Sequence, residues 1–481
     1  MNGRRGGSER FGSGPVPGSR TAVLGLDARV FLVLMAACLV LVSCAGNFDP
    51  LGWLQPGTAT PGGGSTVPSP MLTQTSTAKP TGQASQSPTA AHLTPESKTP
   101  AGGGQPLLIW VPPQFDPANG TPAGDKLKAR LAAFENENPG LKIQVRVKGA
   151  TGPGGLLDSL AAASAAAPGT LPSLIAMPRS DLETAALKGL IFSLDGLTRL
   201  VDDADWYSYS RQLALIQGSV FGLPFAGDSL LMLYRPAKLP TPPTNWPDLI
   251  KAGLPVSFPA ADNQSLITLL LYLSAGGQVK DSQGRPTLQA EPLTKALKLY
   301  ADGQKAGIFP NWLAQYQTDG QAWQAYREQR TQLLITWSSR FLTDLPADTS
   351  AVPIPSLGEA SLTLTTGWLW ALADPDPASD HRTASVHLAE YLVNSDFLSQ
   401  WSAAAGYLPT RPSALTVWSN QSLRALLSPV LLSSQVRPAN DLLLGLGPIL
   451  QEATLQIIKQ QSDPAQTAQA AAERLAVPQS K

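Results

Sequence analysis

One carboxylate in this 481-residue sequence stands out because of its neighbours. Asp228 interrupts the apolar run VFGLPFAGDSLLMLY at residues 220–234. A carboxylate in apolar surroundings is stable only where hydrogen-bond donors reach it. Those donors can belong to a bound ligand or to a neighbouring segment of the chain. Asp228 is therefore a candidate for ligand contact or, alternatively, a structural hydrogen-bond partner.

Further candidate side chains follow short apolar runs that are typical of buried strands. Trp110 lies near the end of the run 107–111, and Arg179 and Asp181 come just after the run 174–177. Ligands of α/β folds bind beyond the carboxyl ends of the strands, so these side chains are candidate contacts. The alternatives are a core position for Trp110, and a helix-capping Asp181 with Arg179 in solvent.

The elements that position these residues alternate between strand and helix patterns. Residues 107–111 are continuously apolar, residues 125–137 have helical spacing, and residues 141–147 alternate apolar with polar side chains. This order forms a βαβ unit, which predicts a parallel sheet covered by helices. An Ala-rich helix over 155–166 and a strand over 174–177 continue the pattern, so we expect the α/β fold class.

The composition limits the chemistry open to the chain. Lys and Arg total 35 against 35 Asp and Glu, without a basic block, which argues against nucleic acid as a partner. Both cysteines, Cys38 and Cys44, lie near the N-terminus, so the rest of the chain can hold no disulfide, zinc cluster or thiol nucleophile.

Catalytic signals are also missing from the sequence. Only three histidines occur, and no H-E-x-x-H, G-x-S-x-G or phosphate-loop motif is present. We therefore expect no enzyme and no cofactor or metal. A cell-surface glycosidase that uses two carboxylates has no spacing signature and stays an alternative.

The N-terminus has the layout of a secretory signal. Arginines at positions 4, 5, 10, 20 and 29 precede the apolar run 30–42, which is shorter than the roughly 20 residues of a spanning helix. The following residues 41–44 (LVSC) resemble the lipobox of bacterial lipoproteins, in which cleavage leaves a lipidated cysteine. We expect a signal peptide over 1–43 and a lipid anchor at Cys44, on the outer face of the cytoplasmic membrane. An uncleaved anchor helix is the alternative.

The next segment, 44–105, is expected to be a tether. From about residue 56 it consists of Thr, Pro, Gly, Ser and Ala with almost no large apolar side chains. Such a segment buries too little apolar surface to offset its ordering entropy, so we expect disorder. Its r.m.s. reach would be on the order of 40 Å.

Segments along the remaining chain resemble a known family. They include, in this order, IWVPPQF at 109–115, IAMPRSDLETAALKGL at 175–190, the 220–234 run, ITWSSR at 335–340 and GYLPTRPSAL at 406–415. These segments look like extracellular solute-binding proteins of ABC importers, in the maltose-binding-like group of mostly sugar binders. The resemblance extends from residue 107 to the C-terminal helix and rests on the order of the segments.

The resemblance implies a two-lobed periplasmic-binding-protein fold of type II. Each lobe would have a mixed, mainly parallel sheet flanked by helices. Strands would cross between the lobes at 225–230, 334–337 and 372–375. The expected N-terminal lobe is 106–225 plus 337–373, and the expected C-terminal lobe is 228–335 plus 376–481.

The resemblance also implies a sugar site between the lobes. A sugar needs aromatic platforms for its ring face and charged or amide groups for its hydroxyls. Phe225 could instead be lobe core, Asn263 could cap a helix, and Tyr407 could be part of a structural turn. Trp368, which follows Gly367, is favoured over Trp370. The candidate ligand-binding residues are Trp110, Arg179, Asp181, Phe225, Asp228, Asn263, Trp337, Arg340, Trp368 and Tyr407.

The function implied by the resemblance is that of a monomeric substrate-binding lipoprotein. It would capture a mono- or oligosaccharide and deliver it to the permease subunits of an ABC importer. A protein of the same fold could bind another small solute or feed a sensor, and nothing in the chain separates transport from sensing.

Overall fold

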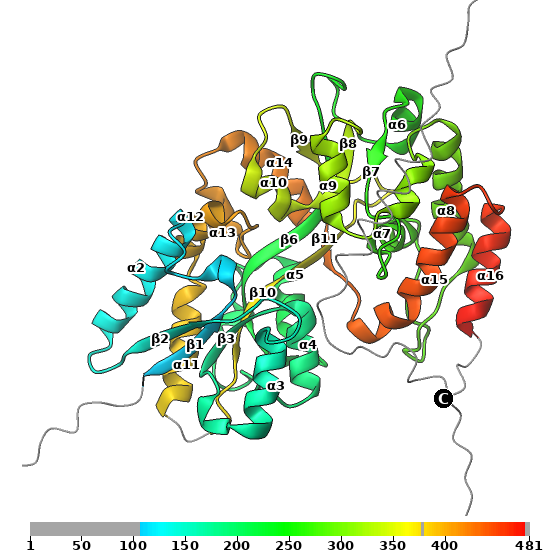
Figure 1. Cartoon of the computed structure of the whole chain (residues 1–481). Coiled ribbons are helices and arrows are strands. Elements are labelled where there is room, and N and C mark those ends of the chain that lie inside the picture. The colour runs from blue at the N-terminus through cyan, green and yellow to red at the C-terminus, as the bar shows by residue number, and fades with distance from the viewer. Residues whose placement is uncertain (1–105, 377–379, 477–481) are drawn as a thin grey trace, which may run out of the picture. The chain divides into compact units, whose positions relative to one another are not determined.

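The computed structural model describes residues 106–376 and 380–476 (Figure 1). A nine-stranded mixed sheet has the order β2-β1-β3-β10-β6-β8-β7, with β11 also paired to β10 and β9 to β6. Helices flank this sheet, which confirms the α/β class. The predicted signal peptide, lipidation site and tether lie outside the described residues. The strands of the sheet are β1 Leu107–Val111, β2 Ile143–Val147, β3 Leu174–Pro178, β6 Leu223–Tyr234, β7 Val256–Ser257, β8 Leu333–Trp337, β9 Ser350–Val352, β10 Thr363–Leu372 and β11 Ser434–Val436.

The first βαβ unit confirms the prediction from the hydrophobic pattern. β1 and β2 are parallel, from Leu107 opposite Ile143 to Val111 opposite Val147. The intervening helix begins at Pro122, because the hydroxyl of Thr121 accepts a hydrogen bond from the backbone N–H of Gly124 (3.1 Å). β3 adds to the other edge of β1, also in parallel.

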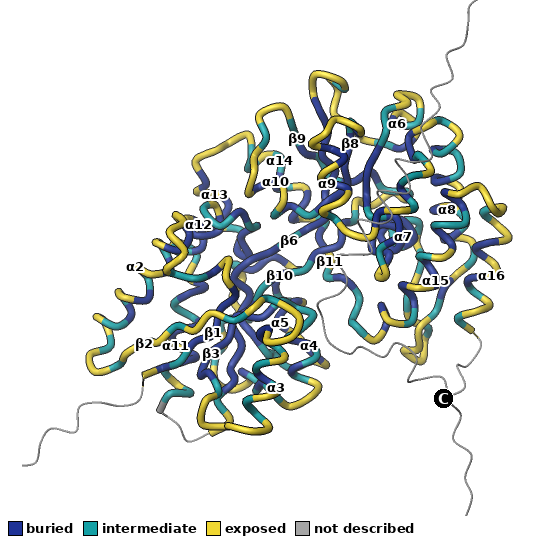
Figure 2. Tube along the Cα trace, viewed as in Figure 1, coloured by how far each residue is buried: buried dark blue, intermediate teal, exposed yellow. Residues whose placement is uncertain are grey.

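Strand β6 joins the two halves of the sheet. Its residues 223–229 pair with β10, and its residues 230–234 pair with β8. All its residues except Asp228 are buried (Figure 2), which explains why the apolar run lacks strand alternation. The first predicted crossing is therefore confirmed.

The other crossings differ from the predicted positions. β8 stays in the half of the sheet that holds β7, because the chain turns from it directly into the helix at Ser338. The second crossing is instead β10, which pairs with β3 at one end and with β11 at the other. Leu372 pairs with Leu174, the first residue of β3, so β10 ends within the first half of the sheet and 372–375 is not a crossing either. The chain returns through β11 into the helix that begins at Asn440.

The helices fall into two groups according to the half of the sheet on which they pack. We call the part around β1, β2 and β3 the first lobe and the part around β7, β8 and β9 the second lobe. The first lobe holds α2 Pro122–Glu137, α3 Leu156–Ala166, α4 Arg179–Leu187, α5 Ser208–Ala214, α11 Asp380–Leu392, α12 Ser395–Ala405 and α13 Pro412–Thr416. The second lobe holds α6 Trp246–Ala252, α7 Leu266–Ser274, α8 Ala290–Lys305, α9 Asp319–Arg327, α10 Ser338–Asp344, α14 Gln421–Leu432, α15 Asn440–Ile458 and α16 Pro464–Ala476.

The placement of α11 and α12 corrects one expectation. Both were predicted in the C-terminal lobe, as part of 376–481. They pack instead against α2. Leu388 and Trp401 share one buried cluster with Ile109 and Leu131 of the first lobe. The order of elements gave no signal for this, because amphipathic helices can cover either half of the sheet.

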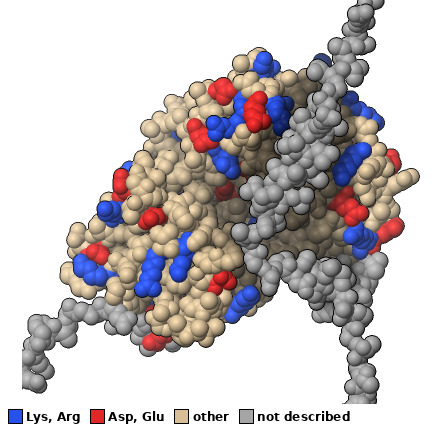
Figure 3. Space-filling model, in the orientation of Figure 1, with Lys and Arg blue, Asp and Glu red and all other residues tan. Residues whose placement is uncertain are grey.

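Lys and Arg side chains lie among Asp and Glu on the face drawn in Figure 3, without a continuous basic area. Within 106–376 and 380–476, no helix is long and apolar enough to cross a membrane.

Candidate functional site

The carboxyl ends of β3 and β11 face each other along one edge of β10. β3 runs antiparallel to β10 and reaches it with Pro178 opposite Trp368, whereas β11 runs parallel to β10 and ends with Val436 opposite Thr365. Both ends therefore point at Thr366 and Gly367, from opposite directions. We call this place the strand junction. Carboxyl ends of strands are where α/β folds bind ligands.

Two arginines continue these strands into the junction. Arg179 is the first residue of α4 after β3, and Arg437 is the first residue after β11. On the other edge of β10, Asp228 of β6 stands opposite Thr366. The junction thus gathers two predicted residues, Arg179 and Asp228, and one residue that the sequence did not single out. Arg437 was missed because the three-residue strand before it is too short to show a pattern.

The carboxylate of Asp228 is bonded by the start of α10. It accepts hydrogen bonds from Ser338 Oγ (2.9 Å), from the Ser339 backbone N (2.9 Å) and from Ser339 Oγ (2.6 Å). Burial raises the pKa of Asp228 to about 6, although these donors act in the opposite direction. Asp228 therefore fixes α10 to the crossing strand, which is the structural alternative predicted for it.

An aromatic group lies beside Asp228. The ring of Phe115 is 5.1 Å from Trp368 and 5.5 Å from Tyr407, between centroids. The turn that carries Tyr407 is held to β6 by Gly227, whose N–H donates to Leu408 O (2.8 Å). Burial, with the nearby charge of Asp228, raises the pKa of the Tyr407 hydroxyl. Trp368 and Tyr407 are both only partly buried. The structure thus brings these two predicted residues close to Asp228.

Two other predicted aromatic residues are part of the core. Phe225 is 2% exposed and stacks on Trp370, with ring centroids 4.8 Å apart. Trp110 is also 2% exposed, with Lys148 Nζ 4.9 Å from the centre of its ring. Neither ring presents a free face in this arrangement, which favours the core alternative for both.

Two predicted residues of the second lobe, Trp337 and Arg340, flank the serines that bond Asp228, whereas Asn263 lies in the loop before α7. Trp337 ends β8 and is partly buried. Arg340 Nε donates to Asp319 Oδ2 (3.3 Å), and Asn263 Oδ1 accepts from Gln451 Nε2 of α15 (3.1 Å). Asn263 thus ties the loop before α7 to α15.

Asp181 and Arg179 share a polar environment at the start of α4. Arg179 Nη2 donates to Leu215 O (3.1 Å), and Asp181 Oδ1 accepts only a long bond from Ser180 Oγ (3.4 Å). Burial raises the pKa of Asp181 and lowers the pKa of Arg179. Both side chains therefore keep hydrogen-bonding capacity, as ligand-binding groups need.

The match to a family model decides what kind of protein carries this site. The model for bacterial extracellular solute-binding proteins matches residues 129–425. The chain belongs to this family. Proteins of this family bind solutes outside the cytoplasm, in agreement with the location expected from the sequence. No curated protein matches this solute-binding protein in sequence.

Solved structures share the fold of this solute-binding protein. The cyclic alpha-maltosyl-1,6-maltose binding protein of Arthrobacter globiformis is 16% identical over 78% of this chain and 98% of its own, with a TM-score of 0.63. The sugar-binding protein MalE of Xanthomonas citri is 18% identical over 77% and 96%, with a TM-score of 0.63. UgpB of Mycobacterium tuberculosis, in complex with glycerophosphocholine, is 16% identical over 78% and 98%, with a TM-score of 0.58. The two-lobed periplasmic-binding-protein fold is thereby confirmed.

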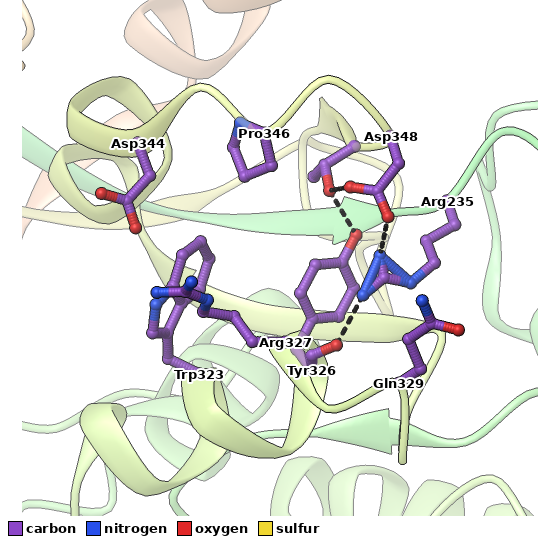
Figure 4. Close-up of a pocket in the computed structure, with 9 residues that line it drawn as sticks. Arg235, Trp323, Tyr326, Arg327, Gln329, Asp344, Pro346 and Asp348 are labelled. Atoms are coloured by element: carbon purple, nitrogen blue, oxygen red, sulfur yellow. Dashed lines mark hydrogen bonds and ion pairs between the residues drawn. The ribbon is translucent and has the colours of Figure 1, made fainter.

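A separate cavity of about 370 Å³ lies in the second lobe, between α9 and residues 344–349 (Figure 4). Its lining residues bond one another. Arg235 donates to Asp348 Oδ2 (2.6 Å) and to Tyr326 O (2.6 Å), and the Tyr326 hydroxyl pairs with Thr349 Oγ1 (3.0 Å). Since these bonds hold the wall together and no predicted ligand residue lines it, we regard this cavity as structural. In the described part of the chain, no cluster of His, Cys, Asp and Glu could hold a metal ion.

Proposed function

We propose that this protein is the lipid-anchored binding component of an ABC importer and captures a carbohydrate between its lobes. The observation that carries the proposal is the strand junction, where the carboxyl ends of β3 and β11 face each other beside the two crossing strands. Partly buried aromatic rings lie beside Asp228 of the crossing strand, and the strand ends carry charged groups that have free hydrogen-bonding capacity. A sugar, with an apolar ring face and a rim of hydroxyls, suits such a set.

The solved relatives support a carbohydrate. The Arthrobacter globiformis and Xanthomonas citri proteins are described as binders of a cyclic maltosyl-maltose and of sugars. UgpB was solved with glycerophosphocholine, which favours another small polar solute as the second candidate. In either case the protein acts by binding, and we assign no catalytic residue.

The remaining parts of the proposal rest on the sequence. The lipobox-like LVSC sequence supports an anchor at Cys44, and the composition of 44–105 supports a tether between membrane and lobes. Such a monomer could present solute to permease subunits without a fixed orientation. A role in feeding a sensor would need the same binding site.

A thermal-shift panel on the full chain in detergent tests the proposal. We expect a sugar at about 100 times its Kd to stabilise the fold by about 2.7 kcal/mol, seen as a rise of several degrees in Tm. Polyols, peptides, polyamines and metal ions complete the panel. A rise with a peptide or a cation, and none with sugars, would overturn the carbohydrate assignment. Loss of the sugar on prolonged incubation would support a glycosidase instead.

A further inference from the structure

The guanidinium group of Arg437 is buried at the strand junction with donor capacity left over. The residue is 7% exposed, and its backbone N–H donates to Thr365 O (2.9 Å). Its Nη2 donates to Asn440 Oδ1 (2.7 Å), whereas its Nη1 is buried without a partner. A buried donor without a partner loses its hydration and gains no bond in return.

Arg179 reaches the same junction from the end of β3. Its Nη2 donates to Leu215 O (3.1 Å), and its Nε and Nη1 are buried without partners. Burial lowers the pKa of both guanidinium groups. The charge of Glu183 opposes this effect on both, and the charge of Arg437 adds to it on Arg179. The two cations are therefore close enough to repel each other, and unbonded N–H groups remain on both.

The nearby carboxylates do not use these donors. Glu183 accepts from the backbone N–H of Asn440 (3.2 and 3.3 Å), so it is committed to the start of α15. Asp181 accepts only the long bond from Ser180. Among the ion pairs of the described residues, none joins Arg179 or Arg437 to a carboxylate. Three buried guanidinium nitrogens, Nε and Nη1 of Arg179 and Nη1 of Arg437, therefore have no acceptor at the junction.

The unpartnered donors indicate which kind of solute group the junction can bind. A neutral sugar hydroxyl that accepts a bond from an arginine must also donate its own proton, and Asp181 is the one carboxylate left to accept it. An oxyanion needs no such acceptor. The unpartnered nitrogens of the two guanidinium groups can donate charge-assisted hydrogen bonds to it.

We infer that Arg179 and Arg437 together bind an acidic group of the solute, so that the preferred ligand is a carbohydrate with a carboxylate or a phosphate. This inference rests on the proposed function and names the substrate class of the same site. Arg437 is a specificity-determining residue, supplied by the return crossing to the second lobe, and Arg179 is supplied by the first lobe. Bridging them with one anion would also favour closure of the lobes.

Isothermal titration of the full chain in detergent with matched sugar pairs tests the inference. The pairs are glucose with glucuronate, cellobiose with cellobiouronate, and glucose with glucose 6-phosphate. We expect at least one acidic member to bind at least tenfold more tightly than its neutral partner, and the carboxylate and phosphate arms identify the group. Equal or weaker binding of the acidic members overturns the inference but leaves the proposed function standing. Absence of binding by every sugar, neutral or acidic, overturns both.

Variants of the two arginines test whether these residues cause the preference for the acidic sugar. Arg437→Gln is expected to reduce binding of the acidic sugar to the level of its neutral partner, and Arg437→Lys to retain part of the preference. Arg285→Gln is the control, since this side chain is 70% exposed and pairs with Asp281 in the second lobe. If Arg437→Gln fails to fold, Arg179→Gln gives the same readout. A full preference for the acidic sugar in a folded variant of either arginine contradicts the assignment.

Discussion

At the scale of single residues, Asp228 shows how burial and hydrogen bonding oppose each other. Three hydrogen bonds from Ser338 and Ser339 favour the charged carboxylate, yet burial outweighs them and raises its pKa to about 6. The folded protein therefore binds a proton at Asp228 more tightly than the unfolded chain does. Its contribution to stability is largest at acid pH and declines as pH rises toward 6.

Asp228→Asn should remove this pH dependence. The difference between a pKa of about 6 and the ordinary 3.8 corresponds to about 3 kcal/mol, lost by the natural protein between about pH 4 and pH 6.5. Relative to the natural protein, the variant should thus gain stability over this range. Urea unfolding of both proteins at several pH values measures it. A stability difference that stays constant from pH 4 to pH 6.5 contradicts the assignment.

Substitutions of Phe225 and Trp368 should distinguish a core residue from a ligand-binding residue. Phe225→Leu should lower the free energy of unfolding by about 1–2 kcal/mol without changing sugar affinity, because the ring is buried against Trp370. Trp368→Leu should weaken binding by tenfold or more at a smaller cost in stability, since this ring is partly exposed. Urea unfolding and isothermal titration of the two variants make the comparison. If the folded Phe225→Leu variant binds sugar more weakly than the natural protein, Phe225 is a ligand-binding residue.

At the scale of elements, the contact between α4 and α15 connects the lobes. Asn440 Nδ2 donates to Ser180 O (2.8 Å), and the backbone N–H of Asn440 donates to Glu183. These bonds place the start of a second-lobe helix on a first-lobe helix. The carboxyl ends of β3 and β11 are held facing each other by the same contact.

Asn440→Ala should loosen this connection. The variant loses the bonds from Asn440 Nδ2 to Ser180 O and Thr184 Oγ1 and the acceptor of Arg437 Nη2. At about 1 kcal/mol for each bond, ligand binding should weaken at least fivefold, because closing the lobes costs more. The radius of gyration of the ligand-free protein, from small-angle X-ray scattering, should rise. Asn420→Ala is the control, since Asn420 caps α14 within the second lobe. An unchanged radius and affinity in Asn440→Ala argues against a connecting role.

The sequence predicted the elements that have a strong pattern. The βαβ start and the crossing by β6 follow from long apolar or alternating runs, which few other structures can accommodate. The return path was mispredicted, because β8 is an ordinary buried strand that looks like a crossing strand, and β11 has only three residues. Arg437 was missed for the same reason. Phe225 and Trp110 could not be assigned to core or site, because both uses demand a buried aromatic ring.

At the scale of the whole molecule, the family places the two lobes outside the cytoplasm, and Cys44 is proposed to hold them to the membrane. Cys44→Ser should then move the protein from the membrane fraction to the soluble fraction after export, with sugar binding unchanged. Fractionation of cells that express either form measures this. Retention of Cys44→Ser in the membrane would favour the alternative, an uncleaved anchor helix.

We expect a carbohydrate to bind between the lobes at the strand junction. A crystal structure of the protein with the sugar that gives the largest thermal shift tests it most directly. We expect intact sugar in contact with Arg179, Trp368 and Arg437. Sugar bound in the cavity beside Arg235, or a hydrolysed sugar at the junction, would contradict it.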